Sequence, residues 1–119
     1  MTTASGHTSA IRAKKVIGTD VKDGAGQKIG TIEDVILDKQ SNNILFAVVG
    51  FGGFLGMKEK YHPLPWEKLD YDEDAGAYCV DVTRSELEAA PVGSIEELTR
   101  NDGAFRERAY DYYQTPRNW

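Results

Sequence analysis

The residues of this 119-residue chain that most resemble a chemical motif form the segment GFGGFLGMKEKYHPLPWEKL, residues 50–69. Four glycines fall within its first seven residues. Closely spaced glycines let a backbone grip a phosphate group, but a dinucleotide-binding loop also opens a helix, and a nucleoside-triphosphate loop ends in Gly-Lys-Ser or Gly-Lys-Thr. The sequence supplies neither feature, so it does not predict a phosphate site here.

A structural role accounts for more of the segment. Apolar side chains between the glycines can fold inward while the backbone turns sharply. Pro63 and Pro65 hold the chain extended and lack the N–H group that a central strand would use. Trp66 then offers a large apolar side chain to fill one end of a small barrel, and its replacement by alanine is expected to cost several kcal/mol.

Three aspartates directly after this segment have the spacing of a calcium loop. Asp70, Asp72 and Asp74 follow the pattern D-x-D-x-D, but Ala75 stands where such a loop requires glycine. The flanking residues are typical of strands, whereas a calcium loop of this kind lies between helices. A solvated hairpin turn is therefore preferred, no metal site is predicted, and the three carboxylates are kept as the metal candidate to test.

Catalytic residues cannot be assembled from the sequence. His62 is the only histidine outside the N-terminal tail, and it lies beside a proline with no recognisable nucleophile near it in the sequence. The sequence therefore predicts a protein that is not an enzyme and needs no cofactor.

The C-terminal region combines arginines with five aromatic side chains, at Phe105, Tyr110, Tyr112, Tyr113 and Trp119. Arginine beside stacking aromatics is typical of proteins that bind single-stranded RNA. The net charge of −5 and the pI near 5.0 oppose attraction to nucleic acid. A helix with Phe105, Ala109 and Tyr112 on one face, docked on the rest of the chain or on a second copy, explains the aromatics equally well. We prefer docking or dimerisation over RNA binding.

The elements that must position these residues are short. Strands are expected over residues 14–21, 28–38, 44–50 and 78–82, separated by turns at Asp23-Gly24 and at residues 39–43. The apolar side of the second strand changes near Glu33-Asp34, which indicates a bulge. The third is apolar throughout, which indicates burial on both sides. After Thr83 the pattern becomes helical, and Thr83 with Glu86 predicts a capping box.

Composition places the chain among ordinary soluble globular proteins, with 40% hydrophobic and 28% charged residues. Its longest apolar run, residues 44–49, is far shorter than the ~20 residues of a membrane-spanning helix. We therefore expect a cytoplasmic protein. Residues 1–12 are expected to form a disordered tail.

Three segments together resemble a PRC-barrel domain over residues 13–91: IGTDVKDGAGQKIGTIEDVILD, AVVGFGGFLGMKEKYHPLPWEKL and YCVDVTRSELEAAP. The positions that match the family are Gly18, Gly30, Gly52, Gly53, Phe54, Leu55, Gly56, Pro65, Trp66, Leu87, Ala90 and Pro91. The family is named for the cytoplasmic domain of the photosynthetic reaction-centre H subunit. It also includes the C-terminal domain of a ribosome-maturation factor and small stand-alone bacterial proteins.

The resemblance implies a mainly β fold, a small closed or partly open barrel of about six strands. From the helical pattern that follows it, we expect a C-terminal helical extension over residues 92–119. The resemblance also implies a docking module rather than an enzyme. We therefore expect an adaptor that acts through contacts with a protein partner and self-associates, as a dimer. The alternatives are an RNA- or ribosome-associated factor and a ligand- or ion-binding barrel.

Overall fold

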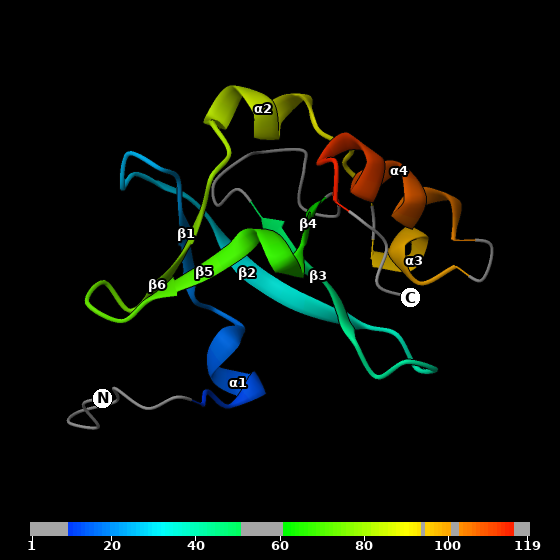
Figure 1. Ribbon diagram of the computed structural model, residues 1–119, viewed down its shortest axis with the longest axis horizontal. Helices are drawn as coiled ribbons and strands as arrows, with labels where there is room; N and C mark the ends of the chain where they lie inside the picture. Colours follow the sequence, from blue (N-terminus) through cyan, green and yellow to red (C-terminus); the bar gives the residue numbers. More distant parts are fainter. Residues whose placement is uncertain (1–9, 51–60, 94, 101–102, 116–119) are drawn as a thin grey trace.

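The computed structural model describes residues 10–50, 61–93, 95–100 and 103–115, and it shows six strands with helices before and after them (Figure 1). The strands are β1 (Asp20–Lys22), β2 (Lys28–Leu37), β3 (Ile44–Gly50), β4 (His62–Pro65), β5 (Leu69–Asp72) and β6 (Ala77–Val80). The helices are α1 (Ala13–Val16), the 3-10 turn η1 (Trp66–Lys68), α2 (Arg84–Ala89), α3 (Ile95–Leu98) and α4 (Ala104–Tyr112).

All six strands belong to one curled sheet with the order β4-β3-β2-β1-β6-β5. Neighbouring strands are antiparallel except β1 and β6, which are parallel. The sheet's two edge strands, β4 and β5, are consecutive in the chain and joined by η1. The prediction of a mainly β, partly open barrel of about six strands followed by short helices is confirmed.

Strand β2 is long because it bends. Its pairing with β3 shifts register between Ile32 and Asp34, as the change of apolar side near Glu33-Asp34 predicted. Gly30 lets the two strands approach closely, since a Cβ atom there would lie 2.7 Å from the carbonyl oxygen of Gly50. The shift lets β2 place Ile32 and Ile36 on opposite faces of the sheet.

The apolar side chains form two clusters on opposite faces of the sheet. Strand β3 contributes to both, because Ala47 and Val49 face the inside of the curl while Phe46 and Val48 face outward. This confirms that β3 is buried on both sides. The other strand residues of the inner cluster are Val21, Ile29, Ile32, Leu64, Leu69, Tyr78 and Val80.

Short helices close the inner cluster. Val16 of α1 and Leu87 of α2 both pack into it. Helix α2 begins with the predicted capping box, in which Glu86 N–H donates to Thr83 Oγ1 (3.1 Å) and Thr83 N–H donates to Glu86 Oε1 (2.9 Å).

The outer cluster is covered by α3 and α4. The rings of Phe46 and Tyr110 meet edge to face, with centroids 5.0 Å apart. The Tyr110 hydroxyl donates to the carbonyl oxygen of Leu45 at 2.9 Å, inside the protein. Between barrel and helices, Tyr61 and Gly93 exchange two backbone hydrogen bonds of 2.8 and 3.0 Å. The C-terminal helix therefore docks on its own sheet.

Two sequence predictions need correction. Residues 14–21 are not one strand: α1 occupies the first part, Gly18 follows with a φ of +94°, and β1 starts at Asp20. In α4, Tyr112 does not lie in the buried face, because it is 39% exposed while Tyr110 is fully buried. At about 100° per residue, Ala109 and Tyr113 lie within the buried stripe and Tyr112 lies at its margin.

Candidate functional site

The glycine-rich segment lies almost entirely outside the described residues. Gly50 ends β3 opposite Thr31, whereas Gly52, Gly53, Phe54, Leu55 and Gly56 fall in the range 51–60, which the structure does not describe. Their assignment to a barrel corner stays a prediction. Gly18 is described, and its positive φ together with its N–H bond to Ile32 O (2.7 Å) explains the glycine there.

The prolines and the tryptophan that follow lie on the segment that links the two edge strands, β4 and β5, along the chain. Pro63 and Pro65 belong to edge strand β4, where a missing N–H is tolerated. Trp66 opens η1 and packs against the inner cluster while remaining half-buried. Its predicted role in filling one end of the barrel stays a prediction.

The acidic run forms the turn between β5 and β6. Asp72 Oδ1 accepts backbone hydrogen bonds from Asp74 (3.0 Å) and Ala75 (3.3 Å), and Gly76 supplies the left-handed residue with a φ of +63°. Within the described ranges, no three His, Cys, Asp or Glu side chains are grouped so that they could hold a metal ion. The arrangement of Asp70, Asp72 and Asp74 is therefore that of a solvated hairpin.

The C-terminal aromatics mostly belong to the protein's own interior. Phe105, Tyr110 and Tyr113 are 5%, 0% and 7% exposed, so they are not available to a second chain or to RNA bases in this structure. Burial, helped by the nearby Glu67, raises the pKa of Tyr110 to about 12. Tyr112 stays exposed and donates its hydroxyl hydrogen to Glu86 O at 2.7 Å, and Trp119 lies beyond the described residues. An interface role for Tyr112 and Trp119 stays a prediction.

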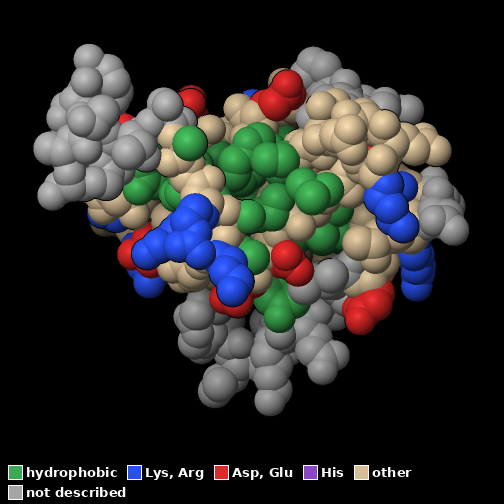
Figure 2. Space-filling model, turned by 90° about the horizontal axis from the view of Figure 1, so that it is seen from below, with side chains coloured by type: hydrophobic (Ala, Val, Ile, Leu, Met, Phe, Trp, Pro, Cys, Tyr) green, Lys and Arg blue, Asp and Glu red, His purple; other side chains and the backbone are tan. Residues whose placement is uncertain are grey.

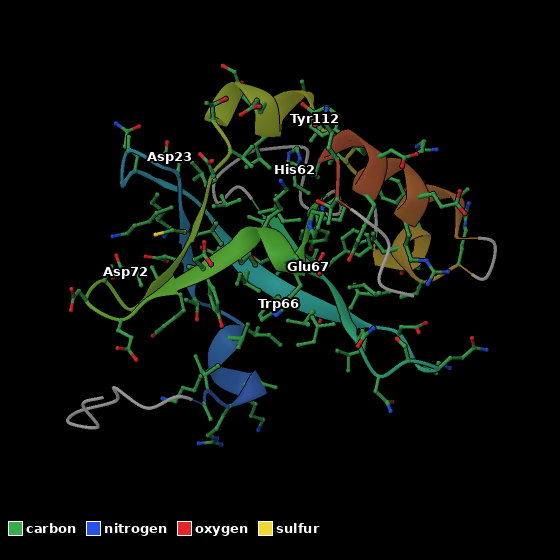
Figure 3. The ribbon with its side chains drawn as sticks, in the orientation of Figure 1. Asp23, His62, Trp66, Glu67, Asp72 and Tyr112 are labelled. Atoms are coloured by element: carbon green, nitrogen blue, oxygen red, sulfur yellow. The ribbon has the colours of Figure 1, made fainter. Side chains whose placement is uncertain are left out.

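His62 lies in β4 under α2 (Figure 3) and is only 4% exposed. Burial lowers the pKa of its imidazole, and the neighbouring Glu88 carboxylate partly opposes this change. The side chain is therefore neutral at pH 7, as a histidine in a protein interior usually is.

A shallow groove of about 520 Å³ separates the β2–β3 hairpin from α3 and α4. Its lining combines the exposed Leu37 with the charged residues Lys39, Arg106 and Glu107. Both charge signs are present, so the groove does not select one class of ligand.

The exposed apolar surface that sequence reasoning missed lies on η1 and the β5–β6 hairpin. The ring of Tyr78 lies between two others, with centroids 5.5 Å from Trp66 and 5.0 Å from Tyr71. Tyr71 is 43% exposed and Trp66 is half-buried. We call Trp66, Tyr71 and Tyr78 the aromatic patch. Figure 2 shows hydrophobic side chains gathered in the middle of the face opposite α2. The sequence signal for this surface was the alternation Asp70-Tyr71-Asp72, which places an aromatic ring on one face of a strand and two carboxylates on the other.

The sequence matches the PRC-barrel domain family over residues 9–87, about two thirds of the chain. The chain belongs to the PRC-barrel family. The match takes in all six strands of this PRC barrel and ends within α2, whereas Ala90 and Tyr113 of the inner cluster lie beyond it. Helices α3 and α4, which cover the outer cluster, lie beyond it.

A relative of this PRC-barrel chain is an "uncharacterized protein" of Deinococcus radiodurans, 24% identical over 103 residues. The aligned region covers 76% of this chain and 36% of the relative, so the chain spans about a third of that protein's length. Among the described residues, no helix combines the length and apolarity that crossing a membrane requires.

Proposed function

We propose that this PRC-barrel protein is a non-enzymatic adaptor that works through protein–protein contacts, and that the aromatic patch is its contact surface. The observation that carries the proposal is the exposure of Tyr71 at 43%, continuous through ring contacts with Tyr78 and Trp66 at the rim of the inner cluster. Tyrosine and tryptophan are enriched in the centres of interfaces, where their large rings lose contact with water.

The position of the patch supports this reading. Tyr78 is itself buried and belongs to the inner cluster, so the exposed rings are anchored to a packed core. A partner that covers Tyr71 would meet a preorganised surface and would lose little side-chain entropy on binding.

We further propose that two copies self-associate by burying their aromatic patches against each other. Sedimentation velocity over a dilution series tests this directly. The full chain is expected to form dimers that dissociate on dilution, and Tyr71→Ser is expected to weaken the dimer at least about tenfold, the loss of about 1.4 kcal/mol of contact energy.

Tyr112→Ser is the matched control, because Tyr112 is exposed to a similar degree, at 39%, on α4. It should leave the dimer unchanged. If Tyr112→Ser weakens the dimer and Tyr71→Ser does not, the contact surface lies on α4 instead. If the chain stays monomeric at every concentration, self-association is refuted. Deleting α4 is unsuitable as a test, because it would uncover Phe46 and Val48.

The alternative of an RNA-associated factor gains no support from the exposed surface, because Tyr110 and Tyr113 are buried. Fluorescence anisotropy with a labelled single-stranded RNA at low salt is expected to show no binding. Binding that weakens steeply with salt would instead favour the RNA-associated alternative.

A further inference from the structure

The outer edge of strand β5 has no neighbour among the described residues. It pairs with β6 on one side and ends the sheet on the other. Every second residue of such an edge strand directs its backbone N–H and C=O groups away from the sheet, where another extended segment can bind them. The edge therefore offers a place to add a strand.

The side chains of β5 alternate in a way that any added strand must match. Leu69 and Tyr71 lie on the inner side, where Leu69 joins the inner cluster and Tyr71 contacts Tyr78. Asp70 and Asp72 lie on the opposite side and are both exposed. An incoming strand therefore meets carboxylates on one of its faces and an aromatic ring on the other.

A second copy of the chain is a poor occupant of this edge. Antiparallel pairing of two β5 strands centred on Tyr71 would place Asp70 of one copy opposite Asp72 of the other, twice. Like charges directly opposite each other destabilise a strand pair, and charged edge residues are a common device against self-pairing. The charge pattern instead selects a partner of opposite sign.

We propose that the β5 edge accepts an extended segment of another protein that carries Lys or Arg at alternate positions with an apolar side chain between them. This deepens the adaptor function proposed above and rests on it. The basic side chains lie beside Asp70 and Asp72, the apolar one lies against Tyr71, and the backbone continues the sheet past β5. Glu73 and Asp74 extend the negative charge beyond the strand end.

The test uses a fluorescein-labelled peptide, Gly-Lys-Val-Lys-Val-Lys-Gly, titrated with the full chain in a fluorescence anisotropy assay at concentrations where the chain is monomeric. The expected result is saturable binding that weakens with salt. Asp70→Lys should reduce the affinity at least about tenfold, because it sets like charges opposite each other.

Asp111→Lys is the matched control, because it makes the same change in net charge at an exposed position of α4, a helix that packs on β4 at the other edge of the sheet (Figure 1). It should change the affinity less than about twofold. Equal losses in the two variants would mean that only overall charge matters, and would overturn the proposal.

A second peptide, with both valines N-methylated, keeps the charges but lacks the backbone N–H donors of the residues that would lie beside Tyr71. Its binding should be lost. Equal binding of the two peptides, or no binding of the first, would overturn strand addition. In either case, a dimer that Tyr71→Ser still weakens would leave the adaptor function standing.

Discussion

The two edges of this sheet are protected in different ways. At the β4 edge, prolines remove N–H donors, Gly93 pairs with Tyr61, and all four residues of β4 are buried. At the β5 edge, three of the four residues are exposed, and no described segment pairs with the side of the strand that faces away from β6. The β4 edge is covered by the protein's own chain, whereas the β5 edge exposes two carboxylates and one tyrosine ring.

We infer from this difference that the β4 edge contributes to stability and the β5 edge to recognition. Substitutions at the β4 edge disturb contacts with α4 and should therefore change the free energy of unfolding. Substitutions at the β5 edge remove little that the folded chain uses internally, so they should change binding instead. The following predictions test this division, and they are ordered by the expected size of their effect.

The largest effect is expected from Gly93→Ala. The added Cβ atom would lie 2.5 Å from Phe105 Cε2, an atom of a ring that is itself buried in the outer cluster. Such overpacking costs about 1–3 kcal/mol. Chemical denaturation should show this loss, whereas Gly24→Ala in an exposed turn should not, because its Cβ would come no closer than 3.9 Å to another residue. If Gly93→Ala and Gly24→Ala have equal free energies of unfolding, Gly93 does not pack closely against Phe105 beside β4.

Trp66→Ala is expected to cost about 2 kcal/mol, less than a fully buried tryptophan would, since the ring is only half-buried against the inner cluster. The same variant should weaken the dimer, because it removes one ring of the aromatic patch. Thermal melting measures the first effect and sedimentation the second. A melting temperature equal to that of the parent protein would show that Trp66 does not stabilise the inner cluster.

His62 should make the β4 edge sensitive to pH. Burial lowers its pKa below the ordinary value of 6.5. Between the lowered pKa and 6.5 the unfolded chain binds a proton that the folded chain does not, so the free energy of unfolding falls as the pH drops through this range. The slope contributed by one proton is at most about 1.4 kcal/mol per pH unit. Urea denaturation from pH 5 to 7 should show that His62→Gln removes this contribution, and an unchanged slope would contradict it.

The smallest effect on stability is expected from Asp70→Lys. The side chain is exposed, so the free energy of unfolding should change by less than about 0.5 kcal/mol. Urea denaturation measures it. A larger loss would show that Asp70 supports the fold, and the variant would then no longer isolate recognition at the β5 edge.

The sequence predicted much of the fold because the signals were local. The Thr83–Glu86 capping box, the bulge near Asp34 and the two-sided burial of β3 each depend on a few adjacent residues, and each was confirmed. Helix α1 was missed because four residues are too few for a period to distinguish a helix from a strand.

The aromatic patch could not have been predicted in the same way. Tyr71 and Tyr78 face each other across the β5–β6 hairpin, and the ring of Trp66 contacts Tyr78 because η1 turns the chain between β4 and β5. The rotation of α4 about its own axis, relative to β3, decides which of its tyrosines are buried. No local sequence pattern indicates that rotation. Contacts that depend on tertiary packing therefore cannot be inferred from local sequence patterns.

The parallel pairing of β1 with β6 has a consequence for the order of folding. Val21 cannot meet Tyr78 until every strand between them has been synthesised, so the chain must close a long loop before this pairing can stabilise the barrel. We therefore expect nascent chains that stop before β6 to stay open on the ribosome, and the complete barrel to form in one late, cooperative step.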